Sequence, residues 1–172
     1  MDTTASDAWF AAVVNPHHEK TVAQEMRYKE MESFLPLYPS RQAWSDRIKT
    51  VLLPLFPGYV FCRFRSGNWM PVLSMPGVRY LVSLNGRPVP IPDDEIAQIH
   101  AVLSSGLTVQ PWPFLKAGQK VRIESGCFDG FEGVLMQDEE KWRVVVGIEF
   151  LCRSVAVEID RTVVRAVVAG RA

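Results

Sequence analysis

The chain has 172 residues, of which 48% are hydrophobic and 22% are charged, with 19 Lys and Arg against 19 Asp and Glu. At roughly 150 residues per domain, this length predicts one medium domain or two small ones and argues against a large enzyme. The high apolar content, which includes nine Phe and five Trp, excludes an intrinsically disordered chain. The balanced charge still permits a local basic surface, because residues 41–87 carry an excess of Lys and Arg over a single acid, Asp46.

Neither a targeting segment nor a metal-binding framework is expected. The first ten residues lack a basic stretch followed by an apolar run, and the most apolar segment, residues 51–60, is broken by prolines and a glycine. This predicts no signal peptide and no membrane span. The three cysteines, Cys62, Cys127 and Cys152, show no CxxC spacing, so neither a disulfide framework nor a zinc site is indicated. We expect a protein of the reducing cytoplasm.

The first half of the chain alternates between strand and helix patterns. The apolar run at residues 9–14 predicts a strand that ends at Asn15, and residues 19–31 show the apolar spacing of a helix packed on a sheet. Prolines hold residues 34–39 in extended backbone. The apolar run at residues 59–64 predicts a central strand.

A short helix through Trp69 is expected next, with Asn68 or Ser66 as its N-cap. Residues 78–84 predict another strand, and a last helix begins at residue 93, where three acids meet the positive end of the helix dipole. Its buried face should be formed by Ile96, Ile99, Val102 and Leu103. This order of elements predicts an α+β sandwich with helices packed against one sheet.

Residues 105–115 contain prolines and a glycine without helical or alternating periodicity, and are the predicted linker between domains at residues 1–104 and 116–172. Short strands separated by polar or glycine-containing turns are predicted at residues 119–124, 131–137, 142–150, 154–159 and 163–167. Five strands in about fifty residues fit a small closed β-barrel, since closure removes exposed strand edges.

Signals for catalysis are weak. The adjacent His17 and His18 have no Asp, Glu or Cys cluster that would complete a metal site. Cys62 lies in an apolar strand, where an inert buried thiol is favoured over a nucleophile. No GxSxG, GxxxxGK[ST] or GxGxxG motif occurs. We therefore predict no catalytic residue, no metal site and no cofactor.

One segment suggests a binding site. Residues 54–59, PLFPGY, combine large aromatics with two prolines and a glycine. A rigid backbone of this kind can display Phe56 and Tyr59 as anchors for a protein partner, but both rings can equally fill the core of the first domain. In the second half, residues 117–134 place glycines where tight strand turns are needed, which alone indicates only a small barrel.

Four N-terminal segments read, in order, WFAAVVNPHHEKTVAQEM, FLPLYPSRQAWSDRIKTVLLPLFPGYVFCRF, WMPVLSMPGVRYLV and PVPIPDDEI, and two C-terminal segments read AGQKVRIESGCFDGFEGVL and RSVAVEID. In this order they resemble the NusG family of transcription elongation factors, over residues 9 to 167. The resemblance implies a ferredoxin-like N-terminal domain, called NGN, joined to an SH3-like barrel that carries a KOW motif.

This resemblance implies a transcription factor without catalytic activity. In the family, the NGN domain binds the clamp helices of the largest subunit of RNA polymerase and favours processive elongation and antitermination. The positions that match the docking face are Trp9, Phe56, Pro57, Gly58 and Tyr59. We expect four basic residues to lie near phosphates of the transcription bubble: Arg41, Arg47, Lys49 and Arg79. The alternative is that they are only solvated surface charges.

The KOW barrel in this family recruits a second partner, such as the termination factor Rho or a small-subunit ribosomal protein. The matching positions are Phe128, Leu151, Cys152 and Arg153. Leu151 and Cys152 stand where housekeeping members commonly carry an aromatic residue and a glycine, which leaves the partner's identity open. Ser74 and Met75 replace polar residues that read the non-template strand in some members, so sequence-selective pausing is not implied.

Residues 39–61 look closer to specialised paralogues of the RfaH, LoaP and UpxY types, which act on selected long operons, and we favour that role over a general housekeeping factor. The C-terminal segment is rich in Val and Ile, which favours strands over refolding into a helical hairpin. A ribosome-associated KOW protein would usually carry a large positive charge, and a thiol enzyme would require a reactive Cys62. Both alternatives rank below the polymerase-binding factor.

Overall fold

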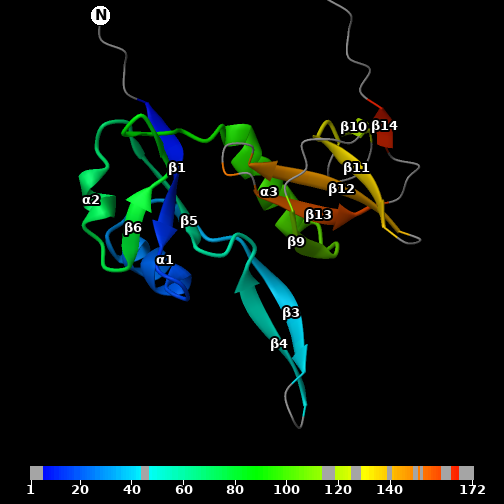
Figure 1. Cartoon of the computed structure of the whole chain (residues 1–172), viewed down its shortest axis with the longest axis horizontal. Helices are drawn as coiled ribbons and strands as arrows, with labels where there is room; N and C mark the ends of the chain where they lie inside the picture. Colours follow the sequence, from blue (N-terminus) through cyan, green and yellow to red (C-terminus); the bar gives the residue numbers. More distant parts are fainter. Residues whose placement is uncertain are drawn as a thin grey trace, which may run out of the picture. The chain divides into compact units, whose positions relative to one another are not determined.

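The computed structural model describes residues 6–43, 47–113, 119–124, 129–138, 141–148, 151, 153–159 and 164–166. The chain divides into two compact units, residues 1–93 and 94–172, which are described separately (Figure 1). Helix α3 (Asp93–Ser104) therefore falls almost wholly in the second unit. The domain boundaries expected from the sequence, at residues 104 and 116, stay a prediction.

A four-stranded antiparallel sheet lies at the centre of the first unit. Its strand order is β2 (Ser33–Phe34), β5 (Tyr59–Arg65), β1 (Asp7–Val14) and β6 (Val78–Leu81). Helix α1 (Glu19–Tyr28) follows β1, and helix α2 (Met70–Leu73) follows β5. The four strands and two helices thus have the split βαβ topology of ferredoxin-like folds, which confirms the predicted α+β class.

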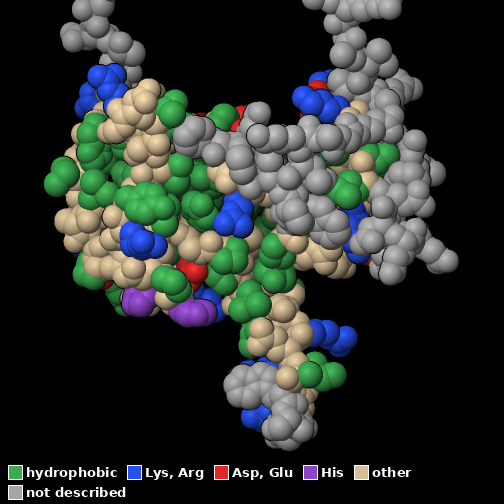
Figure 2. All heavy atoms as spheres, viewed as in Figure 1, with side chains coloured by type: hydrophobic (Ala, Val, Ile, Leu, Met, Phe, Trp, Pro, Cys, Tyr) green, Lys and Arg blue, Asp and Glu red, His purple; other side chains and the backbone are tan. Residues whose placement is uncertain are grey.

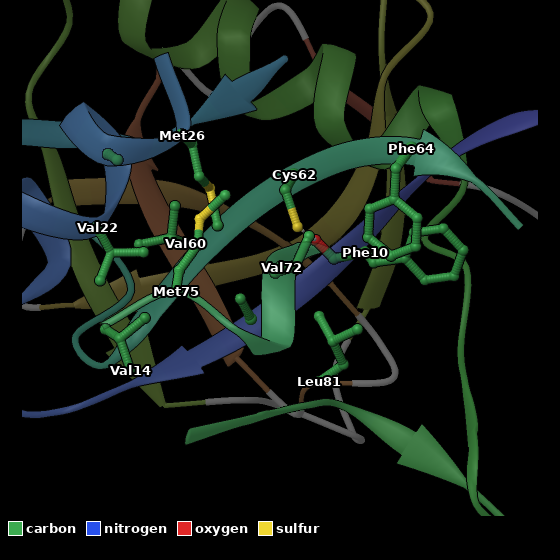
Figure 3. Packing of buried hydrophobic residues seen from close by; sticks show 12 residues of the cluster. Phe10, Val14, Val22, Met26, Val60, Cys62, Phe64, Val72, Met75 and Leu81 are labelled. Carbon is green, nitrogen blue, oxygen red and sulfur yellow. Dashed lines mark hydrogen bonds between the residues drawn. The ribbon is translucent and has the colours of Figure 1, made fainter. Parts of the chain in front are cut away.

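Both helices of the first unit contribute to the core on one face of this sheet. Strand residues alternate between faces, so Phe10 and Val14 of β1 and Val60 and Cys62 of β5 share the face that packs against Val22, Ala23, Met26, Val72 and Met75 (Figure 3). Phe10 and Phe64 stack with ring centroids 4.3 Å apart. This apolar packing holds the two central strands, and hence the loops at their ends, in place.

Helix α1 ends three residues earlier than the apolar spacing indicates. Glu30 has φ of 57°, and the amides of Glu30 and Met31 donate to the carbonyls of Arg27 and Met26. These two bonds form a Schellman motif, which usually requires a glycine and here uses a glutamate. The predicted cap of α2 is wrong: Trp69 holds the N-cap position and Asn68 lies before it. Trp69 makes no side-chain cap bond, since its indole N–H can only donate.

Two hairpins of the first unit were not expected from the sequence. Strands β3 (Leu37–Ala43) and β4 (Ile48–Pro54) form a separate two-stranded sheet that projects away from the central sheet of this unit (Figure 1). Strands β7 (Ser83–Leu84) and β8 (Arg87–Pro88) pair around Asn85-Gly86, both with positive φ. Asn-Gly favours this turn, and the single strand predicted at residues 78–84 is divided between β6 and β7.

The second unit contains helix α3 and a six-stranded antiparallel sheet. The strand order is β14 (Val164–Ala166), β10 (Gln119–Ile123), β11 (Glu132–Asp138), β12 (Lys141–Ile148), β13 (Arg153–Glu158) and β9 (Val109–Pro113). The five strands predicted for this region are present. Of the expected apolar face of α3, Ile96, Ile99 and Val102 are buried and Leu103 is half-buried.

Strand β9 was not expected, because it lies within the predicted linker. It pairs with β13, with Pro111 opposite Val155 and Pro113 opposite Arg153. Proline cannot donate to a sheet ladder and is tolerated at a sheet edge, where β9 stands in the observed strand order. The prolines that suggested a linker are therefore compatible with an edge strand.

Candidate functional site

The segment Phe56–Tyr59, here called the FPGY turn, connects β4 to β5 of the first unit. The amide of Tyr59 donates to the carbonyl of Phe56 at 3.1 Å, and Gly58 has φ of +84°. A type II turn requires positive φ at its third position, which glycine adopts readily, and it commonly has proline at the second. The sequence therefore specifies the shape of this turn locally.

Two neighbouring elements hold the turn in place. The buried carboxylate of Glu19, in the first turn of α1, accepts a 2.9 Å hydrogen bond from the amide of Gly58. The amide of Val14, at the end of β1, donates to the carbonyl of Gly58 at 2.9 Å. Sequence reasoning did not single out Glu19, because an acid in a first helical turn is normally explained by the helix dipole.

The FPGY turn buries one of its aromatic rings and leaves the other partly exposed. Phe56 is 1% exposed and meets Phe61 edge-on, with ring centroids 5.5 Å apart and an interplanar angle of 86°. Tyr59 and Gly58 are half-buried and Pro57 is exposed. Of the two alternatives that the sequence left open for these rings, burial holds for Phe56, whose ring is part of the core, whereas Pro57 and Tyr59 retain exposed surface.

Trp9 and Tyr59 lie on the sheet face opposite to helices α1 and α2. The register pairs Trp9 with Arg63 and Val13 with Tyr59, and paired residues share a face. Four residues along the strands separate the two positions by about 13 Å. Trp9 is 6% exposed. The sheet thus brings two of the predicted docking residues, Trp9 and Tyr59, to one face. Trp9 and Phe56 are buried and contribute little exposed surface.

Arg63 lies beside Trp9 and is held by several partners. Its guanidinium carbon is 6.0 Å from the centroid of the Trp9 ring, within the range of a cation–π contact. It also forms ion pairs with Asp93 at 3.4 Å and Glu32 at 4.0 Å. The sequence showed Arg63 only as one member of the basic segment.

The predicted nucleic-acid-proximal residues fall into two places. Arg41 and Lys49 lie on the β3–β4 hairpin and Arg47 directly precedes β4; all three are exposed, and Lys and Arg side chains stand out on this projection in Figure 2. Arg79 lies on β6 and covers the ring of Tyr80 at 5.9 Å from its centroid. The described residues of the hairpin, 37–43 and 47–54, contain no acid, and the residues that connect them contain one, Asp46. Arg41, Arg47 and Lys49 outnumber it, so this arm can attract an anionic partner.

The predicted partner site of the second unit is described in part. Leu151 is 8% exposed, while Arg153, the first residue of β13, is exposed. Phe128 and Cys152 lie outside the described residues. Of the two members of the set that the structure describes, Leu151 is buried and Arg153 has an exposed side chain.

Cys62 is unsuited to the chemistry of a thiol enzyme. Its side chain is fully buried, and burial raises the pKa of the thiol to about 12, so the reactive thiolate is scarce at neutral pH. His17 and His18 are exposed. Within the described ranges, no three His, Cys, Asp or Glu side chains gather into a possible metal site. The described helices also include none with the length and apolar character needed to cross a membrane.

Comparisons with known proteins agree with this architecture. The family model described as "NusG: Transcription termination factor nusG" matches residues 7–100. The chain is 29% identical over 166 residues to the transcription termination/antitermination protein NusG of Buchnera aphidicola, covering 88% of this chain and 92% of that protein. It is 33% identical over 110 residues to NusG of Escherichia coli K12, covering 61% of each. The solved structure of Thermotoga maritima NusG is 25% identical, with a TM-score of 0.60 over 92% of this chain and 96% of that one.

Proposed function

We propose that this chain, which belongs to the NusG family, binds RNA polymerase through the FPGY turn and the adjoining sheet face of its first unit. The chain is a NusG-like transcription termination/antitermination factor. The more specific proposal is that the clamp helices of the largest polymerase subunit are its docking partner. Docking there favours processive elongation and antitermination.

The rigid, partly exposed FPGY turn is the observation that carries this proposal. Hydrogen bonds to Glu19 and Val14 fix Gly58 on both sides, so little backbone entropy remains to be lost on binding. Pro57 and Tyr59 present exposed surface beside these bonds. Tyrosine is among the residues enriched in binding hot spots. Such a turn suits a protein partner better than a small-molecule substrate.

Replacing Tyr59 by alanine tests this interface. We expect Tyr59→Ala to weaken binding to core RNA polymerase about tenfold or more, which corresponds to about 1.4 kcal/mol. Tyr28→Ala is the matched control, because Tyr28 is a tyrosine with 75% exposure on α1, which covers the opposite sheet face. Dissociation constants are measured by biolayer interferometry, and thermal unfolding by circular dichroism verifies that both variants fold.

The outcomes separate two kinds of failure. Absence of wild-type binding to core polymerase would overturn the proposed function. Wild-type affinity in folded Tyr59→Ala would leave polymerase binding intact but move the interface away from the FPGY turn. Equal losses in Tyr59→Ala and Tyr28→Ala would point to a general effect on the unit instead of a local contact.

The β3–β4 hairpin supports a second contact, with nucleic acid near the polymerase. Arg41, Arg47 and Lys49 are exposed on an arm whose described residues include no acid, and Lys20 attaches the arm to α1 through a 2.8 Å bond from its Nζ to the carbonyl of Leu52. Basic residues on such an arm suit phosphate contacts, which position a protein without reading sequence. Arg79 is proposed as a further phosphate contact on β6.

A second protein partner is proposed for the second unit, through residues 151–153. Arg153, the first residue of β13, supplies exposed charge, and Leu151 is buried. Phe128 and Cys152 belong to the same proposed site. Rho and a small-subunit ribosomal protein are the two candidate partners. Pull-down of each candidate partner by the wild type and by the Arg153→Glu variant tests the site. If the variant captures a partner as well as the wild type does, Arg153 is not part of the site.

We favour a specialised antiterminator, acting on selected long operons, over a general housekeeping factor. The likeness of residues 39–61 to specialised paralogues supports this choice, and these residues include most of the β3–β4 arm and the FPGY turn. Sequencing of RNA after removal of the gene tests it. Loss of distal transcripts in a few long operons is expected, whereas changes across most operons would favour the general factor.

A further inference from the structure

We propose that Glu19 is a positioning residue for the FPGY turn, holding Pro57 and Tyr59 in the orientation that binds polymerase. This inference rests on the proposed function, since it assigns the turn a partner. Glu19 is 6% exposed, and among the described residues only it and Ser154 are polar or charged and buried. A carboxylate in such a place is costly unless hydrogen bonds compensate it. Its bond to Gly58 provides this compensation.

The contacts of Gly58 show why the turn depends on this carboxylate. A Cβ built at Gly58 would meet nothing within 4 Å, so close packing does not confine the residue on that side. The Gly58 amide donates to Glu19 Oε1, and its carbonyl accepts from Val14, both at 2.9 Å. Together with the bond from the Tyr59 amide to the Phe56 carbonyl within the turn, these two hydrogen bonds hold the peptide groups on either side of Gly58 in their orientation.

The first turn of α1 contacts the chain on both sides of Phe56. Glu19 binds the amide of Gly58, and the adjacent Lys20 donates from Nζ to the carbonyl of Leu52 in β4 at 2.8 Å. Helix α1 is itself packed on the sheet through the buried Val22 and Met26. The helix thus links the turn to the core of the unit, while Lys20, being exposed, contributes the weaker contact.

Three substitutions in the full chain test the role of Glu19. Glu19→Ala removes the acceptor, Glu19→Gln keeps an oxygen acceptor without the charge, and Glu25→Ala removes a half-exposed glutamate of the same helix, paired with Lys29, as the matched control. Two quantities are measured for each folded variant: the hydrogen-exchange rate of the Gly58 amide, by NMR on the free protein, and the affinity for core polymerase.

We expect Glu19→Ala to accelerate Gly58 exchange about tenfold or more and to weaken polymerase binding by a similar factor. Glu19→Gln should stay within about threefold of the wild type in both quantities, because its amide oxygen accepts the same bond. Glu25→Ala should change neither. Unchanged Gly58 exchange in Glu19→Ala, or faster exchange with wild-type affinity, would overturn the proposal.

Two further results keep this test separate from that of the proposed function. If the wild type does not bind polymerase, the assigned partner is wrong, and the proposed role of Glu19 in binding is overturned with it. The exchange rate of the Gly58 amide still reports whether Glu19 orders the turn. If Glu19→Ala does not fold, a scalar coupling across the hydrogen bond between the Gly58 amide and the Glu19 carboxyl carbon is sought in the wild type. Its absence would overturn the proposal, and its presence together with a binding defect in folded Glu19→Gln would support it.

Discussion

Replacing Phe56 by alanine should destabilise the first unit before it affects any interface. The ring is 1% exposed and packs edge-on against Phe61. Truncating a buried phenylalanine costs about 3–5 kcal/mol, because transfer free energy is lost and a cavity remains. About 0.5–1.5 kcal/mol of this reflects the aromatic pair. Typical domains have unfolding free energies of about 5–15 kcal/mol, so the variant loses a large part of its stability.

Phe56→Leu separates a core role from a contact role. Leucine keeps much of the buried volume, so we expect a stability loss of roughly 1–2 kcal/mol and polymerase affinity within about threefold of the wild type. Stability is measured from the urea dependence of hydrogen exchange at amides of β1 and β5, which report on the first unit. Affinity is measured only for variants that remain folded.

The opposite pattern would refute this reasoning. If Phe56→Ala cost less than about 1 kcal/mol in stability and still abolished polymerase binding, Phe56 would be a displayed anchor and not a core residue. If Phe56→Leu lost binding while Tyr59→Ala retained it, the exposed part of the FPGY turn would not be the interface.

Three further predictions follow from local geometry. Gly77→Ala should cost more stability than Gly58→Ala in urea denaturation. Both glycines have positive φ, which costs alanine about 1–2 kcal/mol. A Cβ at Gly77 would also lie 3.0 Å from Val22 Cγ2, and this overpacking adds about 1–3 kcal/mol. Equal costs would contradict the packing around Gly77. Burial raises the pKa of Cys62 to about 12, so iodoacetamide at pH 8 should spare Cys62 in the native protein and modify it in urea. Peptide mapping identifies the modified cysteine, and modification of Cys62 in the native protein would contradict its burial. Arg47→Gln and Lys49→Gln should each reduce the salt slope of nucleic-acid binding by about 1, measured by fluorescence anisotropy, and an unchanged slope would exclude their phosphate contacts.

Local patterns were sufficient for most elements of this fold. The apolar alternation of β1 and β5 and the 3.6-residue spacing of α1 act over a few neighbouring residues, so the sequence predicts them directly. The β7–β8 hairpin was missed although its Asn85-Gly86 turn is a local signal. Other failures had a tertiary or unusual local cause. Helix α1 ends through a Schellman motif formed around Glu30 without a glycine, and β9 is a strand because β13 offers it an edge.

The sequence by itself determined the type of the FPGY turn, because proline fixes φ at the second position and glycine adopts positive φ at the third without steric cost. It also carried the family resemblance that the matching family model bears out. Only the tertiary structure decided which ring is buried: Phe56 packs against Phe61, whereas Tyr59 remains half-exposed. Only the tertiary structure brought Glu19 to Gly58, since 39 residues separate them in the chain. Burial and hydrogen bonding depend on atoms brought together by folding, and no pattern of adjacent residues encodes which atoms those are.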